Sequence, residues 1–325
     1  MRREATFSCR LAGRQVDLAD LYACHADGPE FADWALAGDQ DEVRAALALA
    51  QTLEWAGRRL SDTAINLRFI RELHGRLHGR TAPADFRHTQ TWLGAPGCCL
   101  AEADYVPPPP EGLPPTLRQF EEYLMQPTDP HFHPLVRLAF TFYQFQAIHP
   151  FPDANGRVGR LLLSLLPCQW GVTAHPVLTM SAHFAATKQE CDRLLLAVSR
   201  DGDWRSWVVY CLRGVEGQSR DVLRRMKALH RVHRAYRTRL ERQPPGRSLA
   251  RLLSVPDRLL ETPILTAGGL QNILEVNRLH AERAAQHLVD IGVLTPFAPA
   301  AGSTPERGRR PQLYAAIELL NAIAL

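Results

Sequence analysis

The chain has 325 residues, of which 46% are apolar and 22% are charged, and its formal net charge is +4. This composition is typical of a soluble globular protein large enough for one large domain and one smaller domain. No run of eighteen consecutive apolar residues occurs, and the N-terminus MRREATFSCR has no apolar stretch behind its charges. The sequence therefore indicates neither a membrane span nor a secretory signal, and we expect a cytoplasmic protein without a membrane partner.

Helical periodicity dominates the first half of the chain. It predicts helices over residues 40–60 and 62–78, with Ser61 and Asp62 as caps between them. Residues 86–110 (FRHTQTWLGAPGCCLAEADYVPPPP) break this period and predict a short β-hairpin near Gln90–Leu93. Apolar residues then return at helical spacing from Leu135 to Ile148 and again from Val158 to Leu166.

The C-terminal part reads as a separate unit. The stretch QPPGRSLARLL indicates a boundary near Gln243–Gly246. Beyond it, the pattern predicts helices over 249–260, 267–274 and 278–291, and strands 293–295 and 312–314 that pair across a Gly-, Pro- and Arg-rich turn. Helices followed by a small hairpin resemble a winged helix-turn-helix.

The segment HPFPDANGRVGR, residues 149–160, connects the two most apolar helices. A loop that opens onto a helix N-terminus presents unpaired N–H groups and the positive end of the helix dipole, and both favour phosphate. Asn155 and Gly156 stand at this turn, where glycine allows close backbone approach. Arg157 and Arg160 lie three residues apart, so both can point toward one anion. The segment therefore predicts a phosphate site.

Two further residues of the segment suit catalysis. Asp153 is a single carboxylate beside the phosphate cradle, a usual way to hold Mg²⁺ together with substrate phosphates. His149 ends the preceding helix, and an imidazole is available near neutral pH to take a proton from a hydroxyl. Each group alone also fits a structural histidine, an ordinary turn or a solvated arginine pair. Their combination in this order favours the catalytic interpretation.

The segment resembles the signature of the Fic family, H-P-F-x-[DE]-[GA]-N-G-R-x-x-R, at every specified position. The resemblance implies a mainly α fold: a Fic-type helical bundle with a short β-hairpin flap, followed by the winged helix-like domain. The corresponding divisions are an N-terminal region 1–39, a catalytic core 40–242 and a C-terminal domain 243–325.

The resemblance also implies an activity, the Mg²⁺-dependent transfer of AMP from ATP to a Ser, Thr or Tyr hydroxyl of a target protein, which includes the protein itself. His149 would be the base, Asp153 would hold Mg²⁺, and Arg160 would bind the γ-phosphate. The implied nucleotide-binding set is Asp153, Ala154, Asn155, Gly156, Arg157, Gly159 and Arg160. The implied target-binding flap is Gln90, Thr91, Trp92 and Leu93.

The nucleotide base is less well defined by the sequence. Where relatives commonly have paired tyrosines, this chain has Glu190 and Cys191. ATP is the first expectation, and another nucleotide, a phosphocholine donor or a phosphate donor are the alternatives.

A regulatory helix is also implied. Many relatives carry an inhibitory pattern [ST]-x-x-x-E-[GN], whose glutamate pairs with the second motif arginine. In this chain the segment at about residues 5–13 places Ser8, Ala12 and Gly13 at the specified positions, so alanine replaces the glutamate. We expect autoinhibition to be relieved, whether Ala12 is the natural residue or a substitution. Reversal of the modification, which often depends on that glutamate in the family, is disfavoured.

A different class of function is a DNA-binding regulator that uses the Fic domain as a sensor. It depends on the C-terminal domain and the basic run before it, and the basic residues in the candidate recognition region are Arg278, His280, Arg283 and His287. The winged helix could instead form a homodimer interface or bind the target. A pseudoenzyme scaffold is disfavoured because no motif position is substituted.

Overall fold

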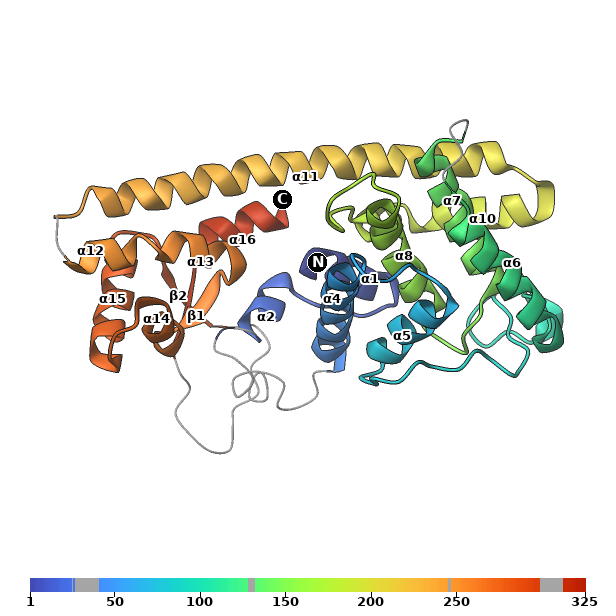
Figure 1. Cartoon of the computed structure of the whole chain (residues 1–325), viewed down its shortest axis with the longest axis horizontal. Helices are drawn as coiled ribbons and strands as arrows, with labels where there is room; N and C mark the ends of the chain where they lie inside the picture. The colour runs from blue at the N-terminus through green and yellow to red at the C-terminus, as the bar shows by residue number, and fades with distance from the viewer. Residues whose placement is uncertain (25, 27–40, 128–131, 245–246, 299–311) are drawn as a thin grey trace. The chain divides into compact units, whose positions relative to one another are not determined.

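The computed structural model of the chain describes residues 1–24, 26, 41–127, 132–244, 247–298 and 312–325 (Figure 1). They form two compact units. The first comprises Met1, Arg3–Arg14 and Ala45–Arg220, and the second Arg2, Gln15–Arg44 and Asp221–Leu325. These divisions differ from the predicted bounds at residues 39 and 242, because helix α11 (Trp204–Glu241) contributes to both units without a break. None of the described helices is both long enough and apolar enough to cross a bilayer.

The first unit is helical, as the periodicity predicts. Besides the first part of α11, its elements are α1 (Arg2–Leu11), α4 (Asp41–Arg59), α5 (Leu67–Leu77), two 3₁₀ turns η1 (Leu100–Glu102) and η2 (Pro110–Gly112), α6 (Leu113–Met125), α7 (Pro134–Ile148), α8 (Asn155–Gln169), α9 (Met180–Ala186) and α10 (Lys188–Asp201). Ser61 and Asp62 do not begin the second predicted helix. Asn66 caps α5 instead, since its side chain accepts a hydrogen bond of 2.8 Å from the Phe69 N–H.

The helices α7 and α8 pack against each other in this unit (Figure 1). They flank residues 149–154, which we call the motif loop. Their apolar faces are buried, with Phe145, Val158 and Leu165 all at 0% exposure. The two helices meet closely at Gly159, where an added Cβ would lie 2.2 Å from Gln146 Nε2. The Trp207 indole N–H donates to the Ala139 carbonyl at 2.9 Å, which fixes α11 against the buried side of α7.

The predicted flap hairpin is reduced to one pair of residues. Leu93 and Tyr105 form an isolated antiparallel bridge, with N–H to carbonyl distances of 2.9 and 3.1 Å. The chain between them turns through Gly97, which has a positive φ of 81°, and through η1. A sequence of this composition satisfies its backbone in turns, so no strand forms at Gln90.

The second unit combines helices with a three-stranded sheet. Besides the end of α11, its elements are α2 (Leu18–Ala23), α12 (Arg247–Leu252), α13 (Val255–Glu261), β1 (Ile264–Thr266), α14 (Ala267–Leu274), α15 (Arg278–Asp290), β2 (Thr295–Phe297), β3 (Leu313–Ala315) and α16 (Ile317–Ala324). The strands are antiparallel in the order β1-β3-β2.

The structure contains helices and paired strands in this unit, with bounds that differ from the predicted ones. The two predicted strands do pair, although they are shifted to 295–297 and 313–315, and their connection lies partly outside the described residues. The third strand, β1, was not predicted. The helix expected over 249–260 is two helices, because Pro256 stands in the first turn of α13 and cannot continue α12.

Candidate functional site

The motif loop is held in an unusual backbone conformation at both ends. His149 follows α7 with φ 49°, and Ala154 precedes α8 with φ 55°. Among the described residues only Glu275 is another non-glycine with positive φ. Such a conformation costs on the order of 1 kcal/mol or more for a residue with a Cβ, and it persists only where the surroundings enforce it. The surrounding structure therefore enforces the backbone conformation of the loop.

Asn155 supplies part of that enforcement. Its amide N–H donates to the Phe151 carbonyl at 2.8 Å, and its amide oxygen accepts from the Phe151 N–H at 2.9 Å. The amide N–H that was expected to bind phosphate thus binds the loop's own backbone instead, as does the amide oxygen. The side chain is buried, and Phe151 beside it is completely buried.

Arg87 anchors the start of the loop and was not identified from the sequence. Its Nε donates to the His149 carbonyl at 2.8 Å, and its other guanidinium nitrogens donate to the carbonyls of Thr89 and Pro108. The Arg87 N–H also donates to the Pro150 carbonyl at 2.9 Å. Arg87 is buried, so one side chain joins the loop to both ends of the flap segment.

His149 has the protonation state that a base needs. Burial, aided by the nearby positive charge of Arg87, lowers the pKa of His149 to about 4, and a hydrogen bond with the Gln146 backbone only partly opposes this. The imidazole is therefore neutral at neutral pH and can accept a proton.

The start of α8 can bind an anion. Its N-cap residue, Ala154, makes no side-chain cap, so the N–H groups of the first turn are unpaired by side chains. A Cβ at Gly156 would lie 2.9 Å from Arg160 Nη1, so glycine allows the Arg160 guanidinium to lie across this turn. Arg157 is half-buried, and its side chain has no hydrogen-bond or ion-pair partner among the described residues. These groups supply positive potential without a bound counter-charge.

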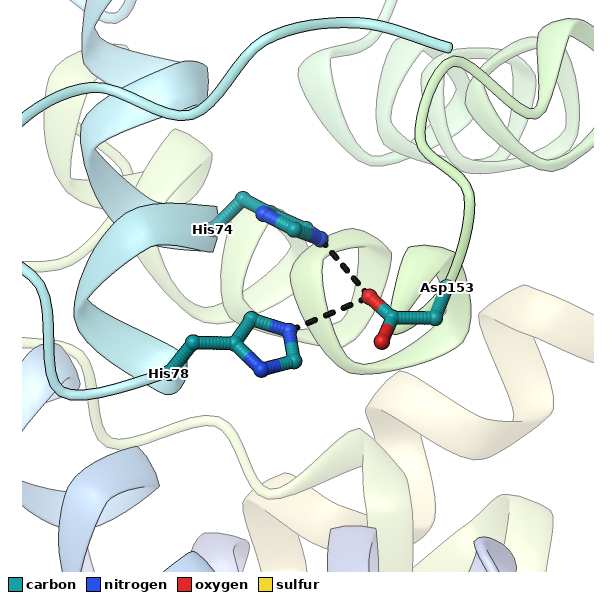
Figure 2. A group of neighbouring side chains, drawn as sticks. All are labelled: His74, His78 and Asp153. Carbon is teal, nitrogen blue, oxygen red and sulfur yellow. Dashed lines mark hydrogen bonds and ion pairs between the residues drawn. The ribbon is translucent and has the colours of Figure 1, made fainter. Parts of the chain in front are cut away.

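Asp153 is held by two histidines that the sequence analysis did not identify. Its Oδ1 lies 3.0 Å from His74 Nε2 and 3.1 Å from His78 Nε2 (Figure 2). Partial burial alone would raise the pKa of Asp153, but the hydrogen bond from His74 and the charges of the two histidines outweigh it and lower the pKa. The carboxylate is ionised at neutral pH, and no hydrogen bond involves Oδ2 within the described structure.

Arg160 is bonded to the N-terminal helix, although alanine stands at position 12. Its Nε donates to Ser8 Oγ at 2.9 Å, and its Nη2 donates to the Ser8 carbonyl at 3.1 Å. Ser8 is fully buried, whereas Ala12 is the exposed C-cap of α1 and Gly13 follows with φ 80°. The α1 segment therefore does contact the second motif arginine, through Ser8.

Glu4 is a second buried polar group on α1. Its carboxylate accepts hydrogen bonds from the Ser181 hydroxyl and from the Ser181 N–H, the latter at 3.2 Å. Burial raises the pKa of Glu4 to about 7, and the Ser181 bonds and the positive charge of Arg160 only partly offset it. Burial likewise lowers the pKa of Arg160 to about 10.

The remaining predicted residues have varied surroundings. In the flap, Gln90 donates to the carbonyls of Thr91 and Pro107, while Trp92 and Leu93 are exposed at 41% and 37%. Gly159 faces α7, so packing accounts for it. Cys191 is buried, and Tyr210, an aromatic residue absent from the sequence prediction, neighbours it. In α15 of the second unit, Arg278 pairs with Glu282 at 3.0 Å and His280 bonds to Asn277, whereas Arg283 is exposed.

Sequence reasoning missed Arg87, His74, His78 and Glu4. The spacing of the histidines, one helical turn apart on a predicted helix, was the available signal for a shared face. Arg87 and Glu4 had no such signal, because their burial depends on tertiary contacts with the motif loop and with Ser181.

Comparisons with known proteins agree with the geometry. Residues 64–166 match the family model described as the Fic/DOC family. The chain is 31% identical over 173 residues to a protein adenylyltransferase Fic of Aedes aegypti, which covers 52% of this chain and 32% of that one. It is 30% identical over 125 residues to the protein of the same name from Nematostella vectensis, with 37% and 27% covered.

The chain thus spans about a third or less of the length of these relatives. A crystal structure of a Fic family protein from Desulfovibrio desulfuricans G20 superposes with a TM-score of 0.56 at 17% identity, covering 97% of this chain and 86% of that one. At this identity the likeness shows the fold alone. Residues 64–166 therefore resemble the Fic/DOC family, and the helical fold of the chain is similar to that of a Fic family protein.

Proposed function

We propose that this chain is a protein adenylyltransferase that transfers AMP from ATP to a hydroxyl of a target protein or of itself. The observation that carries the proposal is the strained loop, which connects a neutral His149 with the N-terminus of α8. Arg157 lies in the first turn of α8 and has no ion-pair partner within the described part of the chain. A base and an anion-binding turn within one rigid loop suit attack of a hydroxyl on a phosphate. The name of the curated relatives supports the same reaction class.

In the proposed reaction, His149 takes the proton from the target hydroxyl as its oxygen attacks the α-phosphorus. A new P–O bond forms to the target, the bond between the α-phosphorus and the bridging oxygen to the β-phosphate breaks, and pyrophosphate leaves. The first-turn N–H groups of α8 and the Arg157 guanidinium stabilise the charge on the phosphate oxygens. Arg160 would reach the γ-phosphate once it releases Ser8.

The site fits a Mg²⁺ ion through one carboxylate oxygen. Asp153 is ionised, its Oδ1 is fixed by the histidines, and its Oδ2 remains available. Asp153 would hold the ion, which when bound to ATP neutralises phosphate charge. The flap residues Thr91 and Trp92 would pair their main chain with the target. Trp92 supports this role because it is exposed and its backbone has no hydrogen-bond partner among the described residues.

Intact-mass analysis tests the reaction and the donor together. The purified chain is incubated with a panel of candidate target proteins and Mg²⁺ plus ATP, UTP, GTP or CTP. We expect a mass increase of one AMP on the chain or on a target with ATP, and none with His149→Ala, which should still bind ATP because it lacks only the base. A UMP, GMP or CMP increase would identify another donor. Undiminished transfer by His149→Ala would refute the assigned base.

The proposal includes regulation through α1. An Ala12→Glu variant tests whether a carboxylate at this position inhibits, as the resemblance implies: labelled-ATP transfer should fall in the variant. Equal transfer in both proteins would contradict a regulatory role for position 12 and leave Ser8 as the contact that matters. Binding of DNA by the second unit and dimer formation stay predictions; a salt-dependent gel shift and sedimentation of the full chain test them.

A further inference from the structure

The cluster around Asp153 contains more metal ligands than a magnesium site uses. His74 Nε2, His78 Nε2 and one Asp153 oxygen all lie within 4.8 Å of one another (Figure 2). Mg²⁺ takes oxygen ligands almost exclusively, whereas imidazole nitrogens suit Zn²⁺ and other first-row transition metals. Two histidines with one carboxylate are the protein ligands of open zinc sites and of several iron sites.

The observed separations are close to those that a metal requires. Ligand atoms at about 2.1 Å from one ion, at tetrahedral angles, lie about 3.4 Å apart. The nitrogen to oxygen distances here are 3.0 and 3.1 Å, so each must widen by only a few tenths of an ångström. The separation of the two imidazole nitrogens is within 4.8 Å.

The fold positions the two histidines independently of any ion. His74 lies in the last turn of α5 and His78 is its C-cap, so the four-residue spacing places both rings on one face. The His74 ring stacks on Phe151 of the motif loop, with centroids 4.1 Å apart and planes inclined by 13°. The site is therefore organised by α5 on one side and by the loop on the other.

The cluster is also accessible. The His74 side chain is 9% exposed, but those of His78 and Asp153 are 32% and 59% exposed. A bound ion would keep open positions for water or a phosphate oxygen. Coordination through Nε2 leaves the Nδ1–H of His74 without an acceptor among the described residues, so the affinity should be lower than that of a closed structural zinc site.

We propose that His74, His78 and Asp153 form a transition-metal site that binds Zn²⁺ or a similar cation in the absence of nucleotide. The competing interpretation is that the histidines only donate hydrogen bonds and orient Asp153 for Mg²⁺. The proposal goes beyond adenylyl transfer, and its test needs no activity, so it can fail or succeed independently of the proposed reaction.

The test is equilibrium dialysis of the chelator-treated full chain against Zn²⁺ without nucleotide, with the bound metal measured by elemental analysis. We expect one equivalent bound, and an affinity lower by at least about tenfold in His78→Ala and in Asp153→Asn. His175→Ala, which removes an exposed histidine elsewhere in the same unit, should bind Zn²⁺ as the parent does. Circular dichroism verifies that each variant is folded. If His78→Ala does not fold, Asp153→Asn alone provides the test.

Two results would overturn the proposal. The first is the absence of a stoichiometric Zn²⁺, or binding that His78→Ala and Asp153→Asn leave unchanged, since the ion would then lie elsewhere. The second is displacement of Zn²⁺ by an equal concentration of Mg²⁺, because two imidazole ligands should favour Zn²⁺ strongly. Retention of Zn²⁺ under that competition, together with its loss in the two variants, supports the site.

Discussion

The first and last residues of the motif, His149 and Arg160, are held in different ways. At the start, Arg87 bonds to the backbone carbonyl of His149 and leaves the imidazole free to react. At the end, the reactive group itself is bonded, because the Arg160 guanidinium contacts both the hydroxyl and the carbonyl of Ser8. The proposed base, His149, is therefore supported through its backbone only. The Arg160 guanidinium, which is proposed to bind an anion, already donates hydrogen bonds to α1. We infer that nucleotide binding competes with α1 at Arg160 and leaves the His149 end unchanged.

Arg157 offers the sharpest contrast with Arg160, because it has no partner to release among the described residues. Arg157→Ala should therefore lower kcat/KM for ATP by about 10²–10³-fold, the cost of removing a positioned oxyanion donor. Steady-state transfer with labelled ATP measures it, and Arg118→Ala on the exposed face of α6 is the matched control. A loss below tenfold would mean that Arg157 does not bind the phosphates.

Arg87 tests whether the His149 end depends on backbone support. Arg87→Ala removes the side-chain donor for the carbonyls of His149, Thr89 and Pro108, together with a longer bond of 3.4 Å to the Ile148 carbonyl. It should lower the free energy of unfolding by about 2–4 kcal/mol. The remaining folded enzyme should also transfer AMP about 10–100-fold more slowly, because the base loses its position.

Urea denaturation and single-turnover kinetics measure the two effects separately. Arg87→Lys keeps the charge but cannot span three acceptors, so it should resemble Arg87→Ala. If Arg87→Lys behaves as the parent, charge alone matters and the geometric interpretation is wrong.

The sequence defined the parts of the molecule that depend on local pattern. The apolar period before and after residues 149–160 predicted α7, α8 and the loop between them, and the motif residues are contiguous in the chain. The groups that support them come from distant segments: Arg87, His74 and Ser8 reach the loop from 62, 79 and 152 residues away. No periodicity or spacing encodes such tertiary contacts.

Other errors had local causes. Ser61 and Asp62 are both good caps, yet the chain continues to Asn66 before α5 begins, because propensity does not choose among neighbouring candidates. The flap composition favoured a hairpin, but its glycines and prolines form turns with one bridge. Ala12 is the C-cap of α1, and the contact with Arg160 is made by Ser8, because that contact depends on which face of α1 is buried.

The buried carboxyl of Glu4, on the same helix as Ser8, should make the stability of the protein depend on pH. Its pKa is raised from 4.5 to about 7, so between these values the folded state binds more protons than the unfolded state, and stability falls as pH rises. The cost should approach about 3 kcal/mol above pH 7. The unfolding free energies of the parent and of Glu4→Gln are measured from pH 4 to 8, and the difference between them isolates the contribution of Glu4. The pKa of His149, about 4, makes stability rise with pH in this range, but this effect occurs in both proteins and cancels. A difference that does not change with pH would contradict a raised pKa of Glu4.

Ser8→Ala should have the smallest effect and the most informative sign. The substitution removes the hydroxyl acceptor of Arg160 Nε but keeps the Ser8 carbonyl contact, so about 0.5–1.5 kcal/mol of interaction is lost. If ATP competes for this guanidinium, that loss appears as an ATP affinity about 2–10-fold higher, with kcat unchanged. Isothermal titration with ATP measures it, and Ser219→Ala on exposed α11 is the control. A lower affinity would instead mean that Ser8 holds Arg160 in the orientation that binds ATP, which would make α1 part of the nucleotide site and remove the difference between the two ends of the loop.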